Sequence, residues 1–521
     1  MAASELPINT SATATQMAQE IFGDGVTVVS ASYTGDSRSS GIYSDGDSTS
    51  PGATPGDTGI ILSTGQASSY TNSSGQENQS NSTSTNTFGQ NNNSQFNSAA
   101  GTNTYDASYM DIDFIPDHAV MTMQFVFSSD EYPEFQNSVY QDFVGVWVNG
   151  VQVDLAVGNG DTDPGNVNST NNENLYLDNT GDAYNTEMDG LSVTMTLTMN
   201  VTPGVLNSIR IGVADVSDSN YDSNLLIGGN SVQTEVIAMT DSTTMYVSGT
   251  ETLDVLDNDI NNGAGSLTIT HINNVPVIVG TIVTLNTGQT VQLNADGTIN
   301  IVGDGDTEDF NFTYTIDNGT NIDTGFVNVS SIPCFVAGTM ITTPDGETRV
   351  EDLALGDLVM TQDDNAQPVR WIGSRQVPAQ GDFAPIRIRA GTFGSHRDLL
   401  VSPQHRILVR DYLAELLFGE PEVLVAAKDL INDRSVLRQT GDHVTYVHLM
   451  FDRHQVIYSE GLATESFLPG PQTTNLFEQP VIDEICSIFP ELDPATGEGY
   501  GSSARRTLRA FEAQLLMSRA A

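Results

Sequence analysis

The residues that could do chemistry gather in the last third of the chain, and the first of them is Cys334. It is one of only two cysteines in 521 residues and lies in the run Ser-Ile-Pro-Cys-Phe-Val-Ala-Gly-Thr. A thiol on the C-terminal side of a peptide bond can attack the preceding carbonyl and convert the amide into a thioester, which is a better acyl donor. Cysteine suits this reaction because its sulfur is intrinsically nucleophilic and its thiolate is accessible near neutral pH. The bond at risk is Pro333–Cys334.

Three polar residues further along the chain could assist that reaction. The amide nitrogen must be protonated as it leaves, and histidine, which titrates near neutral pH, is the natural acid. Our candidate is His405, on a strand that would have to lie next to the strand of Cys334. Ser402, three residues earlier, could hydrogen-bond the carbonyl or the developing oxyanion. His454 is a candidate second acid, base or orienting group.

Each of these residues also has an ordinary structural interpretation. A lone cysteine after a β domain is usually a small buried residue, and a histidine on a strand is more often a packed side chain. His396, His443 and His448 are assigned to that packed class. The Phe-Val-Ala-Gly-Thr context of Cys334 and the Ser-Pro-Gln-His run that ends at His405 favour the reactive interpretation for these two.

Composition changes at the same point of the chain. Residues 1–333 carry 2 of the 18 Lys and Arg but 40 of the 66 Asp and Glu, a net charge of −38, whereas residues 334–521 carry a net charge of −10. The total of −48 argues against nucleic acid and anionic membranes as partners. It favours divalent cations, because so many carboxylates repel one another unless something neutralises them. Two cysteines exclude a disulfide framework.

No targeting or membrane-spanning segment is predicted. The sequence has no window of about 18 consecutive apolar residues, so we expect no transmembrane helix. The start, Met-Ala-Ala-Ser-Glu-Leu-Pro-Ile-Asn, lacks a basic end and an apolar core, so we expect no cleaved signal peptide. A secreted or cell-surface location would therefore need a route without such a peptide.

The first third of the chain alternates between regular and polar stretches. Residues 12–23 predict a short helix that ends on a glycine, and residues 26–33 predict a strand. Residues 35–107 are rich in Ser, Asn, Gly and Gln and poor in apolar residues, which predicts a long solvated loop. From Ser108 onward the pattern again alternates like half-buried strands.

Three segments in this part carry a resemblance to a known domain. They are Ser-Asp-Glu-Tyr-Pro-Glu-Phe from Ser129, Gln-Asp-Phe-Val-Gly-Val-Trp-Val-Asn-Gly from Gln141, and the run from Ile209 to Ile227. Together they resemble the bacterial surface β-sandwich called the choice-of-anchor L domain, over residues 5–240. That family marks exported, envelope-associated proteins, so the resemblance implies a location more than a mechanism.

Residues 241–331 predict a second, smaller β domain. Strands of five to seven residues separated by Asn, Asp and Gly turns fit an Ig-like or cadherin-like sandwich, and the segment resembles modules of large bacterial adhesins. Its acidic clusters offer Asp257, Asp259, Asp304 and Asp306 as ligands for Ca²⁺, a cation that takes several oxygen ligands. The alternative is that these residues only build turns.

The last third predicts an all-β domain followed by a helical tail over residues 471–521. Residues 334–470 resemble the bacterial branch of the Hedgehog/intein (Hint) family, because separate blocks occur in the right order. Cys-Phe-Val-Ala-Gly-Thr-Met-Ile-Thr-Thr-Pro-Asp-Gly matches the N-terminal block with its nucleophile Cys334. Ser-Pro-Gln-His places Ser402 and His405 at the Thr and His positions of the next motif, and His454 matches the histidine of the C-terminal block.

One departure from that family bears on function. Inteins end with His-Asn followed by a nucleophile, whereas Glu465-Ser466 occupies that place here. Full splicing is therefore not expected, and the acyl shift at Pro333–Cys334 would lead to hydrolysis or to transfer to an amine, thiol or alcohol. Pro333 is a second difficulty, because its ring crowds the carbonyl under attack.

The sequence thus predicts a mainly β, multidomain surface protein with domains over residues 1–240, 241–331 and 334–470 and the tail. The acyl donor in the reaction would be the chain's own N-terminal segment, and the acceptor is unidentified. Cell-surface or matrix components are further expected partners. The reaction would need no cofactor, and calcium in the β domains is the open alternative to plain turns. The competing hypothesis is a structural adhesin whose Hint fold is inactive.

Overall fold

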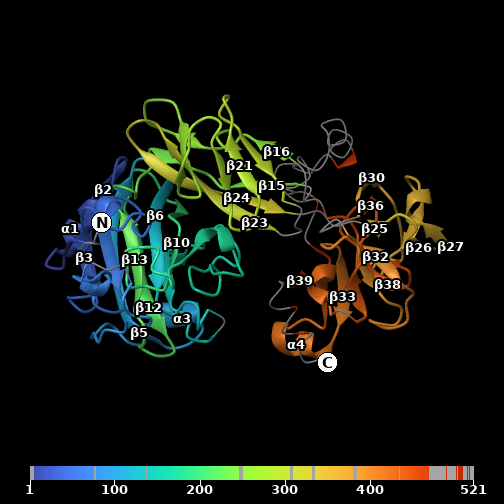
Figure 1. Ribbon diagram of the computed structural model, residues 1–521, viewed down its shortest axis with the longest axis horizontal. Helices are drawn as coiled ribbons and strands as arrows, with labels where there is room; N and C mark the ends of the chain where they lie inside the picture. Colours follow the sequence, from blue (N-terminus) through green and yellow to red (C-terminus); the bar gives the residue numbers. More distant parts are fainter. Residues whose placement is uncertain are drawn as a thin grey trace. The chain divides into compact units, whose positions relative to one another are not determined.

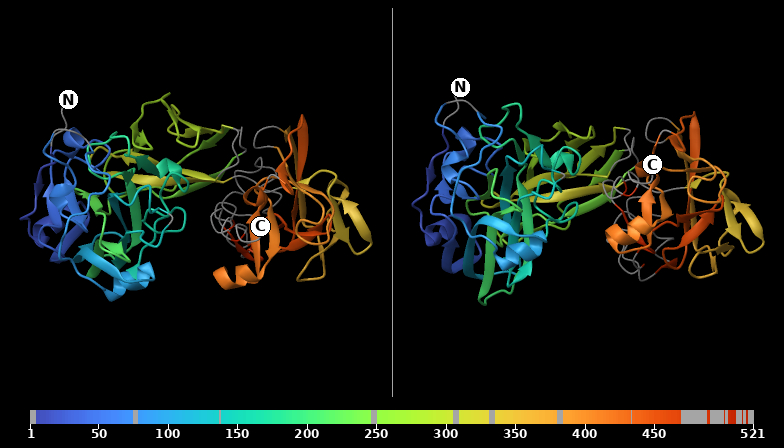
Figure 2. Two further views of the ribbon diagram at one scale, coloured as in Figure 1. Left: turned by 60° about the horizontal axis from the view of Figure 1, so that its bottom comes forward. Right: turned by 90° about the horizontal axis from the view of Figure 1, so that it is seen from below.

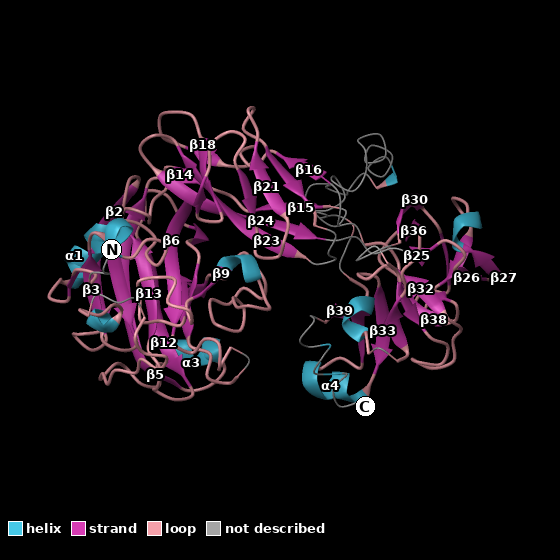
Figure 3. Ribbon diagram, viewed as in Figure 1, coloured by secondary structure: helices cyan, strands magenta, loops and turns pink. Residues whose placement is uncertain are grey.

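The computed structural model describes the greater part of the chain. The described residues are 5–74, 78–136, 138–245, 250–304, 309–330, 335–379, 384–432, 434–468, 488–489, 500, 503–508, 513 and 516. The chain divides into two compact units, the first made of Met1–Asp241, Thr252–Ile301 and Phe310–Asn328, the second of Ser242–Glu251, Val302–Asp309 and Val329–Ala521. Strands dominate both units and helices are short (Figure 3), so the predicted mainly β, multidomain class is confirmed.

The first unit is built on two antiparallel sheets (Figure 1). The larger has the strand order β1, β3, β4, β13, β6, β10, β9, with β11 also paired to β6, and the smaller has the order β2, β5, β12, β7, β8. The bounds in the larger sheet are β1 Ile8–Asn9, β3 Ser40–Tyr43, β4 Gly59–Ser63, β13 Ser223–Gly228, β6 Val120–Ser129, β10 Gly190–Ser192, β9 Tyr176–Asp178 and β11 Met195–Asn200. Those in the smaller sheet are β2 Val26–Thr34, β5 Thr104–Pro116, β12 Asn207–Val216, β7 Phe143–Val148 and β8 Val151–Gln152.

The main core of this unit follows from side-chain alternation along the strands. On β5, Met110, Ile112 and Phe114 are buried, as expected when every second side chain of a strand faces the same side. They join apolar residues of both sheets and of helix α1 (Ala14–Ile21) in one cluster. The helix begins with a capping box between Thr13 and Gln16, which satisfies backbone N–H groups that the first turn leaves free.

The prediction of a long solvated loop over residues 35–107 is wrong. This stretch contains β3, β4, the helices α2 (Gly46–Thr49), η1 (Ala67–Ser69) and α3 (Ser94–Ala100), and the start of β5. Strand β4 is buried throughout and pairs with β3 and β13. Its short Gly-Ile-Ile-Leu-Ser run is hidden in polar sequence, and only long-range pairing makes it a central strand.

Residues 241–330 contain two further sheets. Their orders are β15, β24, β23, β18, β19 and β16, β22, β21, β20, and β14 pairs with β17. The bounds are β14 Val236–Ile237, β15 Asp241–Thr244, β16 Thr250–Leu253, β17 Ile260–Asn261, β18 Thr268–Ile272, β19 Val275–Pro276, β20 Ile282–Thr284, β21 Thr290–Leu293, β22 Ile299–Val302, β23 Phe310–Asp317 and β24 Ile322–Ser330.

One buried acid, Asp323 on β24, joins this module to the larger sheet within the first unit. Its carboxylate accepts hydrogen bonds from the hydroxyls of Thr122 and Thr196, the side-chain amide of Gln124 and the backbone N–H of Ala238. The side chain is fully buried, and four donors satisfy it as a buried carboxylate requires.

The second unit contains the predicted Hint region as two large sheets and a small one (Figures 1 and 2). Their orders are β30, β36, β25, β32, β31, β35, then β27, β26, β37, β38, β33, β34, β39, and finally β28 with β29. The first sheet comprises β30 Trp371–Pro378, β36 His443–Met450, β25 Phe335–Val336, β32 Leu399–Val401, β31 Ile386–Ile388 and β35 Val436–Arg438. The others comprise β27 Gly346–Arg349, β26 Met340–Thr343, β37 Val456–Ser459, β38 Leu462–Glu465, β33 Arg406–Arg410, β34 Glu422–Ala426, β39 Arg506–Thr507, β28 Leu358–Met360 and β29 Ala366–Pro368.

The described positions of the tail bear out its helical prediction only in part: Ile488, Ala513 and Leu516 are helical, whereas Arg506–Thr507 are not. Arg506–Thr507 form a strand, β39, paired in parallel with Val423 and Leu424 of β34, although the sequence predicts a helix there. The exposed edge of β34 offers backbone partners that local helix propensity does not take into account. Leu508 is buried in the domain core. The rest of residues 471–521, apart from the few described positions, lies outside the described residues.

Helices of membrane-spanning length are absent from the described part of the chain. None there is both long enough and apolar enough to cross a membrane.

Candidate functional site

The candidate nucleophile, Cys334, lies outside the described residues, but the strand that follows it is well defined. Phe335 begins β25 and is buried. It pairs with Val401 of β32 on one side and with Val447 of β36 on the other. The chain directly after Cys334 is therefore held in the interior of a six-stranded sheet, next to the strand that leads to Ser402.

The Ser402-to-His405 segment is a turn between two strands. The backbone N–H of His405 donates to the carbonyl of Ser402 at 3.1 Å, which closes the turn. The carbonyls of Pro403 and His405 accept bonds from Lys428 and Ala427. Ser402 and His405 are both buried. Backbone bonds on both sides thus fix the position from which the imidazole projects.

The imidazole of His405 lies against the residue that follows the nucleophile. Its ring centroid is 4.3 Å from that of Phe335, with the planes tilted by 58°. Neither ring nitrogen has a hydrogen-bond partner among the described residues. Burial lowers the pKa of His405 to about 4, with further lowering by Arg406 and His454 against the opposing charge of Glu465. The ring is therefore neutral at pH 7.

A buried charge network borders His405. The Glu465 carboxylate, at the end of β38, accepts the backbone N–H of Arg406 at 2.8 Å and pairs with its guanidinium at 3.1 Å. Nε2 of His454 lies 3.4 Å from the same carboxylate. Burial alone would raise the pKa of Glu465, but Arg406, together with the hydrogen bond from His454, lowers it to about 2. Glu465 is therefore ionised at neutral pH.

His454 is held by partners at both ring nitrogens. Its Nε2 contacts the carbonyl of Ser466 at 3.1 Å, and its Nδ1 accepts the backbone N–H of Ala504 at 2.9 Å. This arrangement corresponds to a neutral ring with the proton on Nε2. Such a ring suits an orienting role better than proton transfer. Of the acid–base role and the orienting role that the sequence left open for His454, its hydrogen bonds favour the second.

The structure thus gathers His405 and His454 around Glu465, with Ser402 in the turn that ends at His405. The sequence analysis missed the roles of Glu465 and Arg406. It considered Glu465 only because this residue replaces the His-Asn ending of an intein. The available signal was an acid at the end of an apolar strand, Gly-Leu-Ala-Thr-Glu, where an isolated buried charge needs a partner.

The residues predicted as calcium ligands have different surroundings. Asp257 and Asp304 are exposed, and Asp306 lies outside the described residues. Asp259 is half-buried and accepts bonds from the backbone N–H of Met239 and the hydroxyl of Tyr314. Within the described ranges, no three or more His, Cys, Asp or Glu side chains are arranged so that they could hold a metal ion.

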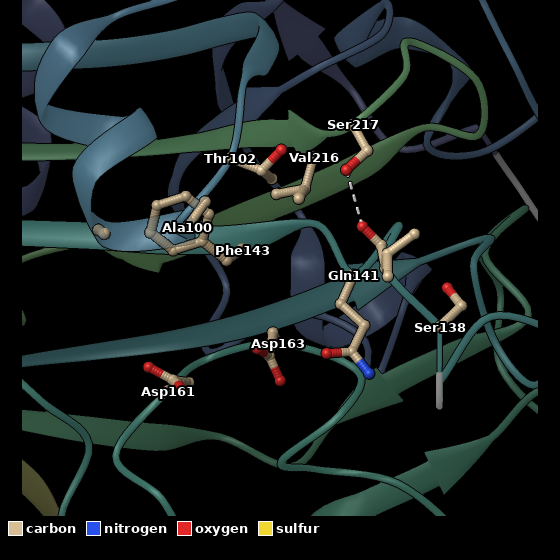
Figure 4. A pocket seen from close by; sticks show the side chains of 11 residues that line it. Ala100, Thr102, Ser138, Gln141, Phe143, Asp161, Asp163, Val216 and Ser217 are labelled. Atoms are coloured by element: carbon tan, nitrogen blue, oxygen red, sulfur yellow. Dashed lines mark hydrogen bonds between the residues drawn. The ribbon is translucent and has the colours of Figure 1, made fainter. Parts of the chain in front are cut away.

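The first unit has a cavity of about 420 Å³ of its own (Figure 4). Gln141, Phe143, Val216, Ser217, Asp161 and Asp163 are among its lining residues. The Ser217 hydroxyl donates to the carbonyl of Val139 across one wall. Burial raises the pKa of Asp163 to about 7. A second cavity, of about 650 Å³, lies in the Hint region and is lined by Arg410, Asp411 and Tyr458 among others.

Comparisons with known proteins agree with this domain arrangement. Residues 7–233 match the model of the Choice-of-anchor L domain, and residues 333–471 match that of the Hint domain. A comparison with curated proteins gives no match.

Solved structures of inteins also match the chain. The MchDnaB-1 intein is 14% identical over 25% of this chain and 99% of its own, with a TM-score of 0.18. The gp41-1 intein is 12% identical over 25% of this chain and 97% of its own, with a TM-score of 0.17. Domains 3–5 of the extracellular part of Drosophila OTK are 9% identical over 47% and 82%, with a TM-score of 0.14.

Proposed function

Because the chain joins a Choice-of-anchor L domain to a Hint domain, we propose that it is a bacterial surface protein that processes itself. In this proposal the Hint domain breaks the Pro333–Cys334 bond and releases or re-attaches the β domains before it. The observation that carries the proposal is the buried, neutral imidazole of His405, 4.3 Å from the ring of Phe335, the residue next to the nucleophile.

The chemistry follows from the state of His405. A neutral imidazole can take the proton of the Cys334 thiol, and the thiolate then attacks the carbonyl carbon of Pro333. As the sulfur–carbon bond forms and the carbon–nitrogen bond breaks, the imidazolium returns the proton to the leaving nitrogen. A histidine with a pKa of about 4 is a strong acid once protonated, which favours this second transfer. The product is a thioester on Cys334 with a free α-amine.

The resulting thioester needs an acceptor. Water would release residues 1–333 as an acid, and an amine, thiol or alcohol would receive them as an acyl group. Glu465 and Ser466 stand where an intein has its His-Asn ending, so the proposal stops short of splicing. Glu465 instead serves as the fixed negative charge that holds Arg406 and His454 beside the turn.

The competing proposal is a structural adhesin in which the same domain is only a fold. Burial of His405 is compatible with both, because a neutral ring packed on Phe335 also fills a core. The discriminating property is covalent change at Pro333–Cys334.

The test is the intact mass of freshly purified protein followed over time. The self-processing proposal expects fragments of residues 1–333 and 334–521, faster cleavage with dithiothreitol or hydroxylamine, and an uncleaved Cys334→Ala variant. Cys486→Ala is the matched control, because it removes the other cysteine and should cleave like the parent chain. A parent chain that stays whole under every condition contradicts self-processing and leaves the adhesin as the better proposal.

A second pair of variants tests the histidine. His405→Gln should slow thiol-induced cleavage at least about a hundredfold, in line with the usual contribution of one acid–base group. His443→Gln, at an exposed position on β36, should leave the rate unchanged. Equal rates in both variants would remove His405 from the mechanism while leaving Cys334 as the nucleophile.

A further inference from the structure

The small β module contains a stretch of chain without charge. Residues 260–295 include no Asp, Glu, Lys or Arg, although the whole chain has a net charge of −48. Their one histidine, His271, is neutral at pH 7 because burial lowers its pKa. The stretch covers β18 and β19 at one end of the first sheet of the module, and β20 and β21 at one end of the second. In each sheet, this edge strand and its neighbour therefore carry no charged side chain.

The segment that joins β19 to β20 is apolar and exposed. Its four large aliphatic side chains on the surface are those of Val275, Ile278, Val279 and Ile282, which are 44%, 78%, 59% and 61% exposed. Elsewhere among the described residues, no eight consecutive positions hold as many exposed large apolar side chains. Single apolar residues are normal on a protein surface, whereas a contiguous group marks a place of interaction.

Hydrogen bonds and buried neighbours hold this segment in one conformation. The backbone N–H of Ile278 donates to the hydroxyl of Thr281 at 3.0 Å, and the N–H of Thr281 donates to the carbonyl of Ile278 at 2.8 Å. Val277 and Val283, on either side of this turn, are buried. The exposed side chains thus project from a fixed backbone, which reduces the entropy that is lost when a partner binds.

Strand β20 also has a free edge. It is the last strand in the order β16, β22, β21, β20 and pairs with β21 in regular antiparallel register. An antiparallel strand uses the backbone groups of alternate residues for each neighbour, so β20 has a second set of N–H and C=O groups on its unpaired side. Proteins often protect such an edge with charges, proline or a bulge. β19 contains Pro276, whereas β20, although only three residues long, has no such protection.

We propose that this face binds a second copy of the chain, with β20 of the two copies side by side and antiparallel about a two-fold axis. Addition of a strand at an open edge supplies main-chain hydrogen bonds. The aliphatic side chains between Val275 and Ile282 pack against the same side chains of the other copy, because a two-fold interface brings one surface patch against itself.

Charge determines which kind of partner fits this face. Residues 1–333 carry 40 Asp and Glu but only two arginines and no lysine, so a basic partner gains most by binding the acidic surface. A partner as acidic as the chain itself is repelled there and approaches best where charge is absent. A second copy is by definition equally acidic, and residues 260–295 give it an uncharged place to bind.

The test uses the full chain carrying Cys334→Ala, which stays whole whether or not the parent chain processes itself. Sedimentation equilibrium over a range of protein concentrations should show a monomer–dimer equilibrium. Added NaCl should strengthen the dimer, because salt screens the repulsion between the acidic surfaces of the two copies. A chain that stays monomeric at every concentration overturns the proposal and leaves this face to a different protein. A dimer that salt weakens overturns it as well.

A matched pair of variants locates the interface. Ile278→Glu places one negative charge from each copy in the interface and should raise the dissociation constant of the dimer at least about tenfold, because like charges across an interface repel. Val151→Glu is the control, since Val151 is 70% exposed and lies on β8, the edge strand of another sheet in the same unit. It should dimerise like the parent. An equal loss in both variants overturns the assignment to this face.

Thermal unfolding of the same samples checks that the variants fold. Because the Ile278 side chain is mostly exposed, Ile278→Glu should melt like the monomeric parent. If it does not fold, Ile282→Glu takes its place, because a charge on an edge strand blocks pairing with another strand, and the same loss of dimer is expected. A folded variant of either kind that keeps the affinity of the parent overturns the proposal.

Discussion

The two units bury acidic groups in opposite ways. In the Hint region, Glu465 is 1% exposed and its charge is balanced by Arg406 and bordered by His454. In the first unit, Asp323 is equally buried, yet it meets only hydroxyl, amide and backbone N–H donors. Accordingly, the pKa of Glu465 falls to about 2, whereas burial raises that of Asp323 to about 7 despite its donors.

This difference follows from the uneven supply of positive charge. A carboxylate beside a guanidinium keeps its charge when it is buried, because Coulomb attraction compensates for the lost water. A carboxylate among neutral donors is compensated less and therefore binds a proton more readily. A domain with two arginines and 40 acids over residues 1–333 must rely on donors, protons or external cations.

The largest expected effect comes from breaking the buried ion pair. Glu465→Ala leaves Arg406 beside the interior without its counter-charge, and such a change typically costs about 3 kcal/mol or more of unfolding free energy. Denaturant unfolding of the Cys334→Ala chain, followed by the fluorescence of Trp371 in a Trp147→Phe background, measures the Hint unit. A cost below about 1 kcal/mol would show that the network adds little stability.

The next effect is the removal of the buried acid in the first unit. Asp323→Ala leaves the donors of Thr122, Gln124 and Ala238 unpaired, at a cost of about 2 kcal/mol. The fluorescence of Trp147 in a Trp371→Phe background reports on this unit. Asp323→Asn is the control, because it keeps an acceptor at the same place, and it should recover most of the loss if hydrogen bonding rather than charge matters.

The two units should respond to pH in opposite directions. The pKa of Asp323 and that of Asp163 rise from 3.8 to about 7 through burial, so the folded first unit binds protons more tightly and gains stability as pH falls from 7 toward 4. Burial lowers the pKa of His405 from 6.5 to about 4, so the Hint unit loses stability as pH falls from 6.5 toward 4.

Thermal unfolding of the two single-tryptophan variants between pH 7.5 and 5 measures both trends in one protein. Trp147 and Trp371 are both buried, and each lies in one unit, so each signal has one source. If both melting temperatures change in the same direction as the pH falls, the proposed difference between the buried ionisable groups of the two units is contradicted.

The smallest expected effect is at an exposed ion pair. Arg370 and Asp452 lie 2.7 Å apart, but their side chains are 45% and 54% exposed, so water screens the attraction. Asp452→Ala should cost less than about 1 kcal/mol. This variant is the control for Glu465→Ala, and an equal loss in both would mean that burial is not the decisive difference.

Much of the candidate site could be predicted from the sequence because its signals are local. The Ser402-to-His405 turn follows β32, which pairs with β25. His405 itself lies in that turn, so the prediction that it sits on a strand beside the strand of Cys334 is wrong. The cysteine itself and Asp306 lie outside the described residues, so their roles remain predictions. The calcium ligands proposed from acidic clusters also stay untested.

The failures share one cause. Strand β4 was hidden in a polar stretch, and Arg506–Thr507 pair with β34 instead of forming a helix. Both outcomes depend on partner strands far along the chain, which local composition does not register. Glu465 was taken as a lost splicing residue for the same reason, since Arg406 lies 59 positions away.

The sequence by itself determined the β class, the order of the two recognisable domains and the residues from which a reaction would have to be built. These features could be predicted because strand alternation, turn residues and motif blocks each depend on residues that are close together in the sequence. Only the tertiary structure decided which acids are buried together and what neutralises them. That outcome depends on distances between side chains from separate strands, as between Arg406 on β33 and Glu465 on β38.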